Sequence, residues 1–235
     1  MKPIAIFRHA STEGPGYFAD YLDSRKLAWR VIEVDQGEPV PKNANEFSGL
    51  SFMGGPMSVS DELSWIAPVL HLIQDAVSCD IPVIGHCLGG QLMSKALGGA
   101  VSRNPVKEIG WGQVNVESSF AAGRWLDGVE AFEGFHWHGE AFTIPPRATR
   151  LLSNRWCHNQ AFVLGPHIGM QCHVEMTEDL VRTWVSGGAA EIADSRLSPA
   201  VQSPEEIQHR LPGRISALQR VARRIYDRWV EGLKT

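Results

Sequence analysis

The stretch Ile81-Pro-Val-Ile-Gly-His-Cys-Leu-Gly-Gly-Gln91 decides the fold. A short apolar run ends at Gly85, a thiol follows at Cys87, and two glycines lead into a run with helical spacing. This order predicts a buried strand, a tight turn and a helix, which is the elbow on which α/β enzymes present a nucleophile. Small residues suit such an elbow because its turn is tight and the backbone at the nucleophile is strained.

Two chemical consequences follow for Cys87. The N-terminus of the predicted helix favours the thiolate form, and the amide of Leu88 is free to donate a hydrogen bond to an oxyanion. The alternative interpretation makes Cys87 a small buried hydrophobe with glycines that serve packing alone. Its position between the glycines of an elbow favours the nucleophile.

A cysteine nucleophile needs a base, and the base needs an orienting group. His173 ends the apolar run of residues 168–172, so it is expected at the carboxyl end of a strand, where open α/β sheets gather their active sites. Glu175 lies two residues further on and can hold the tautomer of the ring. Cys87, His173 and Glu175 are therefore predicted to form a catalytic triad.

The other histidines carry less chemistry. His71 and His209 are expected at the surface, and His86 is expected to point away from Cys87. A metal site is a further interpretation for His136, His138, Cys157 and His158. Because no additional carboxylate or thiol ligand follows at regular spacing, we expect no metal there.

Three motifs together resemble those of class I (triad-type) glutamine amidotransferases. Residues 85–91 are similar to the family's Gly-x-Cys-x-Gly-x-Gln, and His173-Val-Glu175 resembles its His-Pro-Glu. The turn Gly54-Gly55-Pro56 resembles its oxyanion loop. Further matches in order and spacing are residues 110–112, residues 138–140 and Gln171. The similarity covers residues 3 to 186 and is closest to the glutaminase domain of GMP synthase and its stand-alone relatives.

The resemblance implies a substrate and roles for individual residues. The acyl donor would be glutamine or another γ-glutamyl compound, and no cofactor is implied. The amides of Gly55 and Leu88 would hold the oxyanion. The expected substrate-binding residues are Gly54, Gly89, Gly90, Gln91, His138 and Glu140, with the loop around Glu13 on the rim of the pocket.

The sequence departs from the family pattern in two places. Cys172 replaces the usual Phe and Val174 the usual Pro, and we expect both to alter the wall of the pocket. Ser186-Gly-Gly188 lacks the remainder of the nucleotide-binding motif that opens the pyrophosphatase domain of GMP synthase. It is expected to end a helix instead.

The predicted fold is α/β, an open and mostly parallel, flavodoxin-like sheet flanked by helices. The expected strands cover residues 3–7, 30–34, 50–53 and 81–84, then short strands over 113–171; the expected helices cover 60–77, 88–97 and 177–186. Residues 1–188 would form the amidotransferase-like domain. Residues 189–235 would form a connection and a C-terminal helix packed on that domain through Ile215, Leu218, Ala222, Ile225, Trp229 and Leu233.

Composition excludes several classes of function. The 235 residues carry 22 basic and 26 acidic side chains, a net charge of 22 − 26 = −4, which does not favour nucleic acid or an anionic membrane as a partner. No apolar run approaches the ~20 residues of a membrane span. The four cysteines form no C-x-x-C pair, so we expect reduced thiols and a cytoplasmic location.

Three functions remain open at this stage. The first is hydrolysis of a γ-glutamyl amide bond without a partner, and the second is supply of ammonia to a separate synthetase. The third is a catalytically quiet binding or regulatory protein. The complete Cys–His–Glu set argues against the third.

Overall fold

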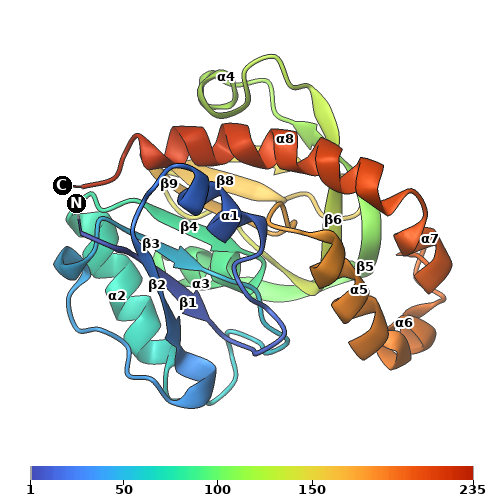
Figure 1. Cartoon of the computed structure of the whole chain (residues 1–235), viewed down its shortest axis with the longest axis horizontal. Helices are drawn as coiled ribbons and strands as arrows, with labels where there is room; N and C mark the ends of the chain where they lie inside the picture. Colours follow the sequence, from blue (N-terminus) through green and yellow to red (C-terminus); the bar gives the residue numbers. More distant parts are fainter. Residues whose placement is uncertain (1, 235) are drawn as a thin grey trace.

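A computed structural model describes residues 2–234, which form one twisted sheet between two layers of helices (Figure 1). Within these residues the strand order is β10-β5-β7-β8-β9-β4-β3-β1-β2, and β6 pairs with β5. The predicted α/β class with an open, mostly parallel sheet is confirmed. No helix in the described part of the chain is long and apolar enough to cross a membrane.

The parallel part of the sheet carries the site. It consists of β2 (Trp29–Glu33), β1 (Ile4–Arg8), β3 (Gly49–Phe52), β4 (Val83–His86) and β9 (His167–Met170), paired in that order. Their short apolar runs suit strands that are covered on both faces. Because all five run the same way, the residues that follow β1, β3, β4 and β9 meet at one edge of the sheet.

The remaining strands extend the sheet, mostly in antiparallel fashion. They are β8 (Ala161–Leu164), β7 (Thr149–Ser153), β5 (Val101–Val116), β6 (Ala131–Phe142) and β10 (Ala200–Val201). The strand β5 begins well before the predicted residue 113. Its first half is rich in polar residues, contains Pro105 and is interrupted by a bulge between Arg103 and Glu108, so it lacks the alternation by which strands are recognised.

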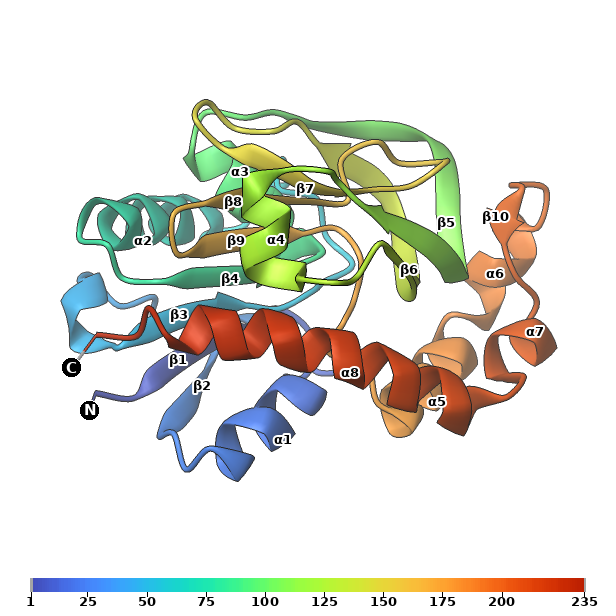
Figure 2. The same ribbon diagram turned by 90° about the horizontal axis from the view of Figure 1, so that it is seen from above.

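Helices cover both faces of the sheet (Figure 2). One face carries α1 (Tyr17–Ser24) and the long α8 (Leu211–Val230), and the other carries α2 (Ile66–Ser78) and α3 (Leu88–Ala96). Strand β1 shows why two cores result: Ile4 and Ile6 lie in the cluster under α8, whereas Ala5 and Phe7 lie in the cluster under α2 and α3. Alternate side chains of a strand point to opposite faces.

The shorter helices lie beyond the parallel strands. They are α4 (Phe120–Leu126), α5 (Glu178–Gly187), α6 (Ala189–Ser195) and α7 (Pro204–Gln208), with 3-10 turns at Val34–Gln36 and Ala44–Glu46. Residues 189–203 therefore hold a helix and a short strand where only a connection was expected. The predicted helix from Ser60 begins at Ile66, and Leu63, placed on its apolar stripe, is 38% exposed in the preceding turn.

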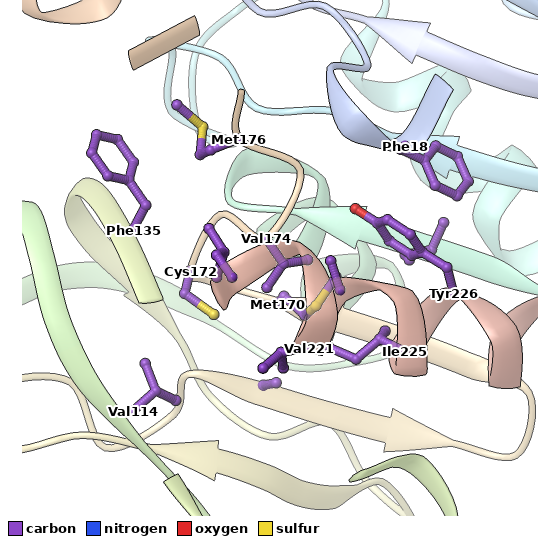
Figure 3. Packing of buried hydrophobic residues seen from close by; sticks show 14 of the residues in the cluster. Phe18, Val114, Phe135, Met170, Cys172, Val174, Met176, Val221, Ile225 and Tyr226 are labelled. Atoms are coloured by element: carbon purple, nitrogen blue, oxygen red, sulfur yellow. The ribbon is translucent and has the colours of Figure 1, made fainter. Parts of the chain in front are cut away.

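The apolar stripe of α8 lies in the core. Ile215, Leu218, Ala222, Ile225 and Trp229 are all buried in one cluster with side chains of the sheet. Figure 3 shows Cys172 and Val174 in the same cluster as Val221 and Ile225. The two departures from the family motif thus face the core under α8 and do not line the pocket, contrary to the expectation, because alternate residues after β9 point to opposite sides.

Candidate active site

Cys87 occupies a strained turn between β4 and α3. It is the N-cap of α3 with φ 50° and ψ −106°, a conformation that a non-glycine residue rarely adopts. Its N–H donates to the carbonyl of Met170 at the end of β9, 2.8 Å away. The side chain is 5% exposed, so the elbow holds the thiol at the edge of the sheet with little freedom.

The glycines after Cys87 let α3 approach the sheet closely. A Cβ at Gly89 would collide with the carbonyl oxygen of Phe52, and a Cβ at Gly90 would collide with that of Met170. The two residues therefore lie behind the elbow, against β3 and β9. Their side of α3 cannot hold larger residues without moving the helix that Cys87 caps.

His173 and Glu175 form a buried pair beside the elbow. His173 Nδ1 donates to Glu175 Oε1 over 2.6 Å, and the side chains are 1% and 2% exposed. Burial lowers the pKa of His173, but the charges of Glu175 and Cys87 outweigh it and hold that pKa well above its usual value. Burial raises the pKa of Glu175, and the charge of His173 reverses the effect and lowers it. The geometry therefore favours an imidazolium–carboxylate pair.

The second ring nitrogen of His173 is available for chemistry. Nε2 is buried, and within residues 2–234 no oxygen or nitrogen bonds to it. The charge of the Cys87 sulfur contributes to the raised pKa of the ring. This is the position that a general base needs.

His86 and Tyr226 lie behind the Glu175 carboxylate. His86 Nε2 lies 4.0 Å from Glu175 Oε2, and the Tyr226 hydroxyl of α8 lies 3.3 Å from the same nitrogen. His86 does not line the cavity next to Cys87. Its contact with Glu175 was not expected from the sequence, because it joins residues far apart in the chain.

The loop after β3 lies over the start of α3. A Cβ at Gly55 would stand 2.7 Å from Leu88 Cδ2, so the two residues whose amides are expected to hold an oxyanion are neighbours. His9, buried at the end of β1, places Nδ1 3.0 Å from the carbonyl oxygen of Met53 and 3.3 Å from that of Gly54. Burial lowers the pKa of His9 to about 4, so the ring is neutral and its Nδ1–H holds this loop.

A cavity of about 700 Å³ opens in front of Cys87 and His173. Of the expected substrate-binding residues, Gln91, His138 and Glu140 line it. Gly54, Gly89 and Gly90 are not part of its lining. The volume lies in the range of small-molecule sites, with room for more than a glutamine side chain.

Glu13 lies near the His173–Glu175 pair. A Cβ at Gly54 would collide with the Glu13 carboxylate and lie 3.1 Å from His173 Cε1, so both side chains lie close to Gly54. Burial raises the pKa of Glu13 to about 7, although the charge of His173 opposes the shift. The sequence predicted this loop on the pocket rim, and Glu13 lines the same cavity as His173.

A buried polar network lies beyond the cavity. His138 Nε2 stands 3.0 Å from Glu108 Oε2, whose carboxylate also accepts hydrogen bonds from Asn154 and Gln160. Potential metal-ligating atoms of Glu108, His136 and His138 lie within 4.8 Å of one another. Both carboxylate oxygens already have amide donors, so we interpret the group as a support for His138. Of the four residues weighed as ligands, this group holds His136 and His138 but not Cys157 or His158.

Other lining residues come from the C-terminal part of the chain. The indole of Trp184 in α5 stands edge-on to the His173 ring, 4.8 Å between centroids, and its Nε1 donates to the carbonyl of Thr12. Glu191 of α6 accepts from Trp137 and pairs with Lys107. No sequence signal marks these residues, because each reaches the site through folding of distant segments.

The fold and the site define a class of α/β proteins with a cysteine at a strand–helix elbow and a buried His–Glu pair beside it. The family model described as "Glutamine amidotransferase class-I" matches residues 17–183. The chain therefore belongs to the class I glutamine amidotransferase family, and the predicted family is confirmed.

Similar proteins carry related names. A glutamine amidotransferase-like protein of Salmonella typhimurium, YfeJ, is 31% identical over 208 residues, which cover 85% of this chain and 87% of YfeJ. One of the subunits of a glutamine-hydrolyzing GMP synthase, from Sulfolobus acidocaldarius, is 33% identical over 66% of this chain and 80% of its own. The crystal structure of a glutamine amido transferase from Methylobacillus flagellatus is 43% identical, with a TM-score of 0.98 over 100% of this chain and 96% of that one.

Proposed function

We propose that this protein hydrolyses a γ-glutamyl amide bond, of glutamine or another γ-glutamyl compound, through a thioester on Cys87. The observation that carries the proposal is the buried His173–Glu175 pair with its second imidazole nitrogen free beside the Cys87 elbow. A catalytically quiet binding protein would not require a cysteine in a strained turn next to a buried His–Glu pair. We expect this activity in the cytoplasm, because the four cysteines form no C-x-x-C pair.

The reaction follows from the roles of the three side chains. Cys87 Sγ attacks the γ-carbonyl carbon while the amides of Gly55 and Leu88 hold the developing oxyanion, an interaction worth about 3 kcal/mol per donor. His173 Nε2 gives its proton to the leaving nitrogen, the C–N bond breaks, and a thioester remains. His173 then takes a proton from water, the hydroxide attacks the thioester, and glutamate leaves as the C–S bond breaks. Glu175 orients His173 and stabilises its charged form.

Independent action is the version that we favour. The loop carrying Gly55 is held by His9 from within the same chain, so the oxyanion donors have support without a partner. Within residues 2–234, neither the Gly55 nor the Leu88 amide donates to another protein group. Both amides are thus available to a substrate.

The alternative is an ammonia-supplying glutaminase for a separate synthetase. The similarity to the GMP synthase relative from Sulfolobus acidocaldarius favours it. Such a glutaminase would be inactive by itself and would turn over glutamine only with its synthetase, because ammonia released in the absence of the synthetase is wasted.

The deciding experiment measures turnover by the isolated chain. Purified protein is assayed with glutamine and with a panel of γ-glutamyl amides and dipeptides, and Cys87→Ser serves as the control. Steady turnover that Cys87→Ser abolishes supports independent hydrolysis. Turnover only after a cell extract or a synthetase is added would establish the alternative instead.

Affinity labelling tests the nucleophile separately. Burial raises the pKa of Cys157 to about 12 and raises that of Cys172 as well, so both thiols stay neutral and react poorly. A chloroketone analogue of glutamine should therefore modify Cys87, located by mass spectrometry. Equal labelling of the four cysteines would contradict the assignment.

A further inference from the structure

The side chain of Gln171 reaches the sulfur of Cys87. Gln171 follows β9 and is completely buried, and its Nε2 lies 3.5 Å from Cys87 Sγ. The carbonyl oxygen of Trp137 lies 3.9 Å from the same sulfur. A carbonyl favours the protonated thiol, whereas an N–H donor favours the thiolate. Gln171 therefore supplies the contact that suits the reactive form.

A second glutamine fixes which end of the Gln171 amide faces the sulfur. Gln91 Nε2 lies 3.2 Å from Gln171 Oε1 and 3.3 Å from the carbonyl oxygen of Glu140. Its two hydrogens are thus directed at two oxygens. If the Gln171 amide were reversed, two NH₂ groups would face each other and an oxygen would face the thiolate. The network therefore selects the orientation in which Gln171 donates to Cys87.

The backbone holds donor and acceptor at the same place in the sheet. The Cys87 N–H donates to Met170, the residue before Gln171, and the Gln171 N–H donates to the carbonyl of Gln160, both over 2.8 Å. Cys87 and Gln171 are therefore both fixed by backbone hydrogen bonds at the end of β9. Their contact does not depend on a mobile loop.

We propose that Gln171 stabilises the Cys87 thiolate by hydrogen bonding, and that Gln91 acts as a positioning residue that holds the Gln171 amide. The inference rests on the proposed function, since it concerns the activation of the same nucleophile. A thiolate that is 5% exposed has lost most of its water, so donors must replace the lost hydration. Gln171 is a neutral donor, and its contribution does not require a charge on His173.

The test measures the thiolate directly, without turnover. Iodoacetamide is reacted with Cys87 between about pH 5 and pH 9, since only the thiolate reacts, and the modified site is followed by mass spectrometry. Gln171→Met removes the donor and should lower the alkylation rate at neutral pH about tenfold, a typical value for a hydrogen bond to a charged group. The rate profile should move to higher pH with an unchanged plateau.

A matched control separates this role from general damage to the core. Gln160→Met makes the same substitution at another fully buried glutamine, whose amide donates to Glu108 and not to the sulfur. Its alkylation profile should match that of the parent protein. Gln91→Met should shift the profile in the same direction as Gln171→Met but by less. The Gln171 amide is still present in this variant and loses only the hydrogen bond that fixes its orientation.

A second variant keeps the test decisive if Gln171→Met does not fold. Gln171→Glu keeps the shape of the side chain and replaces the NH₂ group by an oxygen, so it should suppress alkylation at neutral pH at least as strongly. Alkylation profiles of folded Gln171 variants that coincide with the parent would overturn the inference. Absence of γ-glutamyl hydrolysis with a shifted alkylation profile would overturn the proposed function alone.

Discussion

Glu13 places a carboxyl group in the same cavity as His173, where burial disfavours its charged form. Burial raises its pKa to about 7 in the folded protein, whereas an exposed glutamate titrates near its ordinary value. The folded state therefore holds this proton more tightly than the unfolded chain. Stability from this group is fully present at acid pH and is lost as the pH rises through about 7.

Replacing Glu13 by Gln should remove the loss of stability that accompanies ionisation of Glu13 above about pH 7. We expect the free energy of unfolding of Glu13→Gln to exceed that of the parent by about 2 kcal/mol at pH 8 and by less at pH 5. Urea denaturation at the two pH values measures it. The exposed Glu130, changed to Gln, serves as the control. A gain that is equal at both pH values would show that Glu13 is not desolvated.

The residues of the proposed triad should contribute unequally to turnover. His173→Asn removes the only proposed proton carrier and should reduce kcat by about 10⁵-fold, whereas Glu175→Gln should cost about tenfold to a hundredfold less. His71→Asn, on the exposed face of α2, is the control and should leave kcat unchanged. Equal tolerance of the two triad changes, measured on a substrate identified in the hydrolysis panel, would show that another histidine serves as base.

The sequence predicted the side chains that share short motifs and missed those that meet through folding. Cys87 follows a recognisable elbow, and His173 and Glu175 are two residues apart, so their proximity requires no tertiary information. His9 contacts the loop after β3 and Trp184 contacts His173, although these two residues are 175 positions apart in the chain. No local spacing marks such contacts, because they depend on the order of strands in the sheet.

The same division holds for helices and strands. Elements with strong apolar periodicity, such as α8, were predicted within a few residues. The segment of β5 before residue 113 and the helix α6 were not. The first half of β5 lacks regular alternation, and α6 is a short helix with one buried residue, Ile192. Cys172 and Val174 were expected at the pocket and lie in the core, since the side to which a residue points depends on the register after β9.

The helix α3 should tolerate no side chain on its inner face. Gly89→Ala would bring a Cβ against the carbonyl oxygen of Phe52, so we expect a loss of about 2 kcal/mol or more in unfolding free energy. Gly213→Ala makes the same change in α8, where a Cβ meets nothing within 4 Å, and should add about 0.5 kcal/mol. Chemical denaturation compares the two. Equal effects would show that α3 can move away from the sheet.

At the scale of the whole molecule, we propose that residues 189–235 unfold together with residues 1–188. The buried side of α8 shares one cluster with strands and with α1, so neither part has a separate core on this face. Thermal unfolding followed by far-UV circular dichroism and by tryptophan fluorescence should give coincident transitions. Two separated transitions would indicate that the C-terminal segment is an independent unit.

The two ends of the chain lie side by side (Figure 1). The Lys2 ammonium donates to the carbonyl of Asn45, and the Lys234 amide donates to that of Ser48, so both ends rest on the same short segment before β3. Proteins with neighbouring termini commonly accept circular permutation. A short linker could join the ends, and new termini could open at Gly128, in an exposed turn with φ 73°.

In such a permuted chain the ribosome would make the histidine and the carboxylate before the cysteine. The three groups would nevertheless meet at the same edge of the sheet, because strand pairing and not the order of synthesis determines their positions. We expect the permuted protein to retain the hydrolytic activity of the parent, measured on the same γ-glutamyl substrates. The reaction would then depend on the folded arrangement of the three side chains and not on their order in the chain.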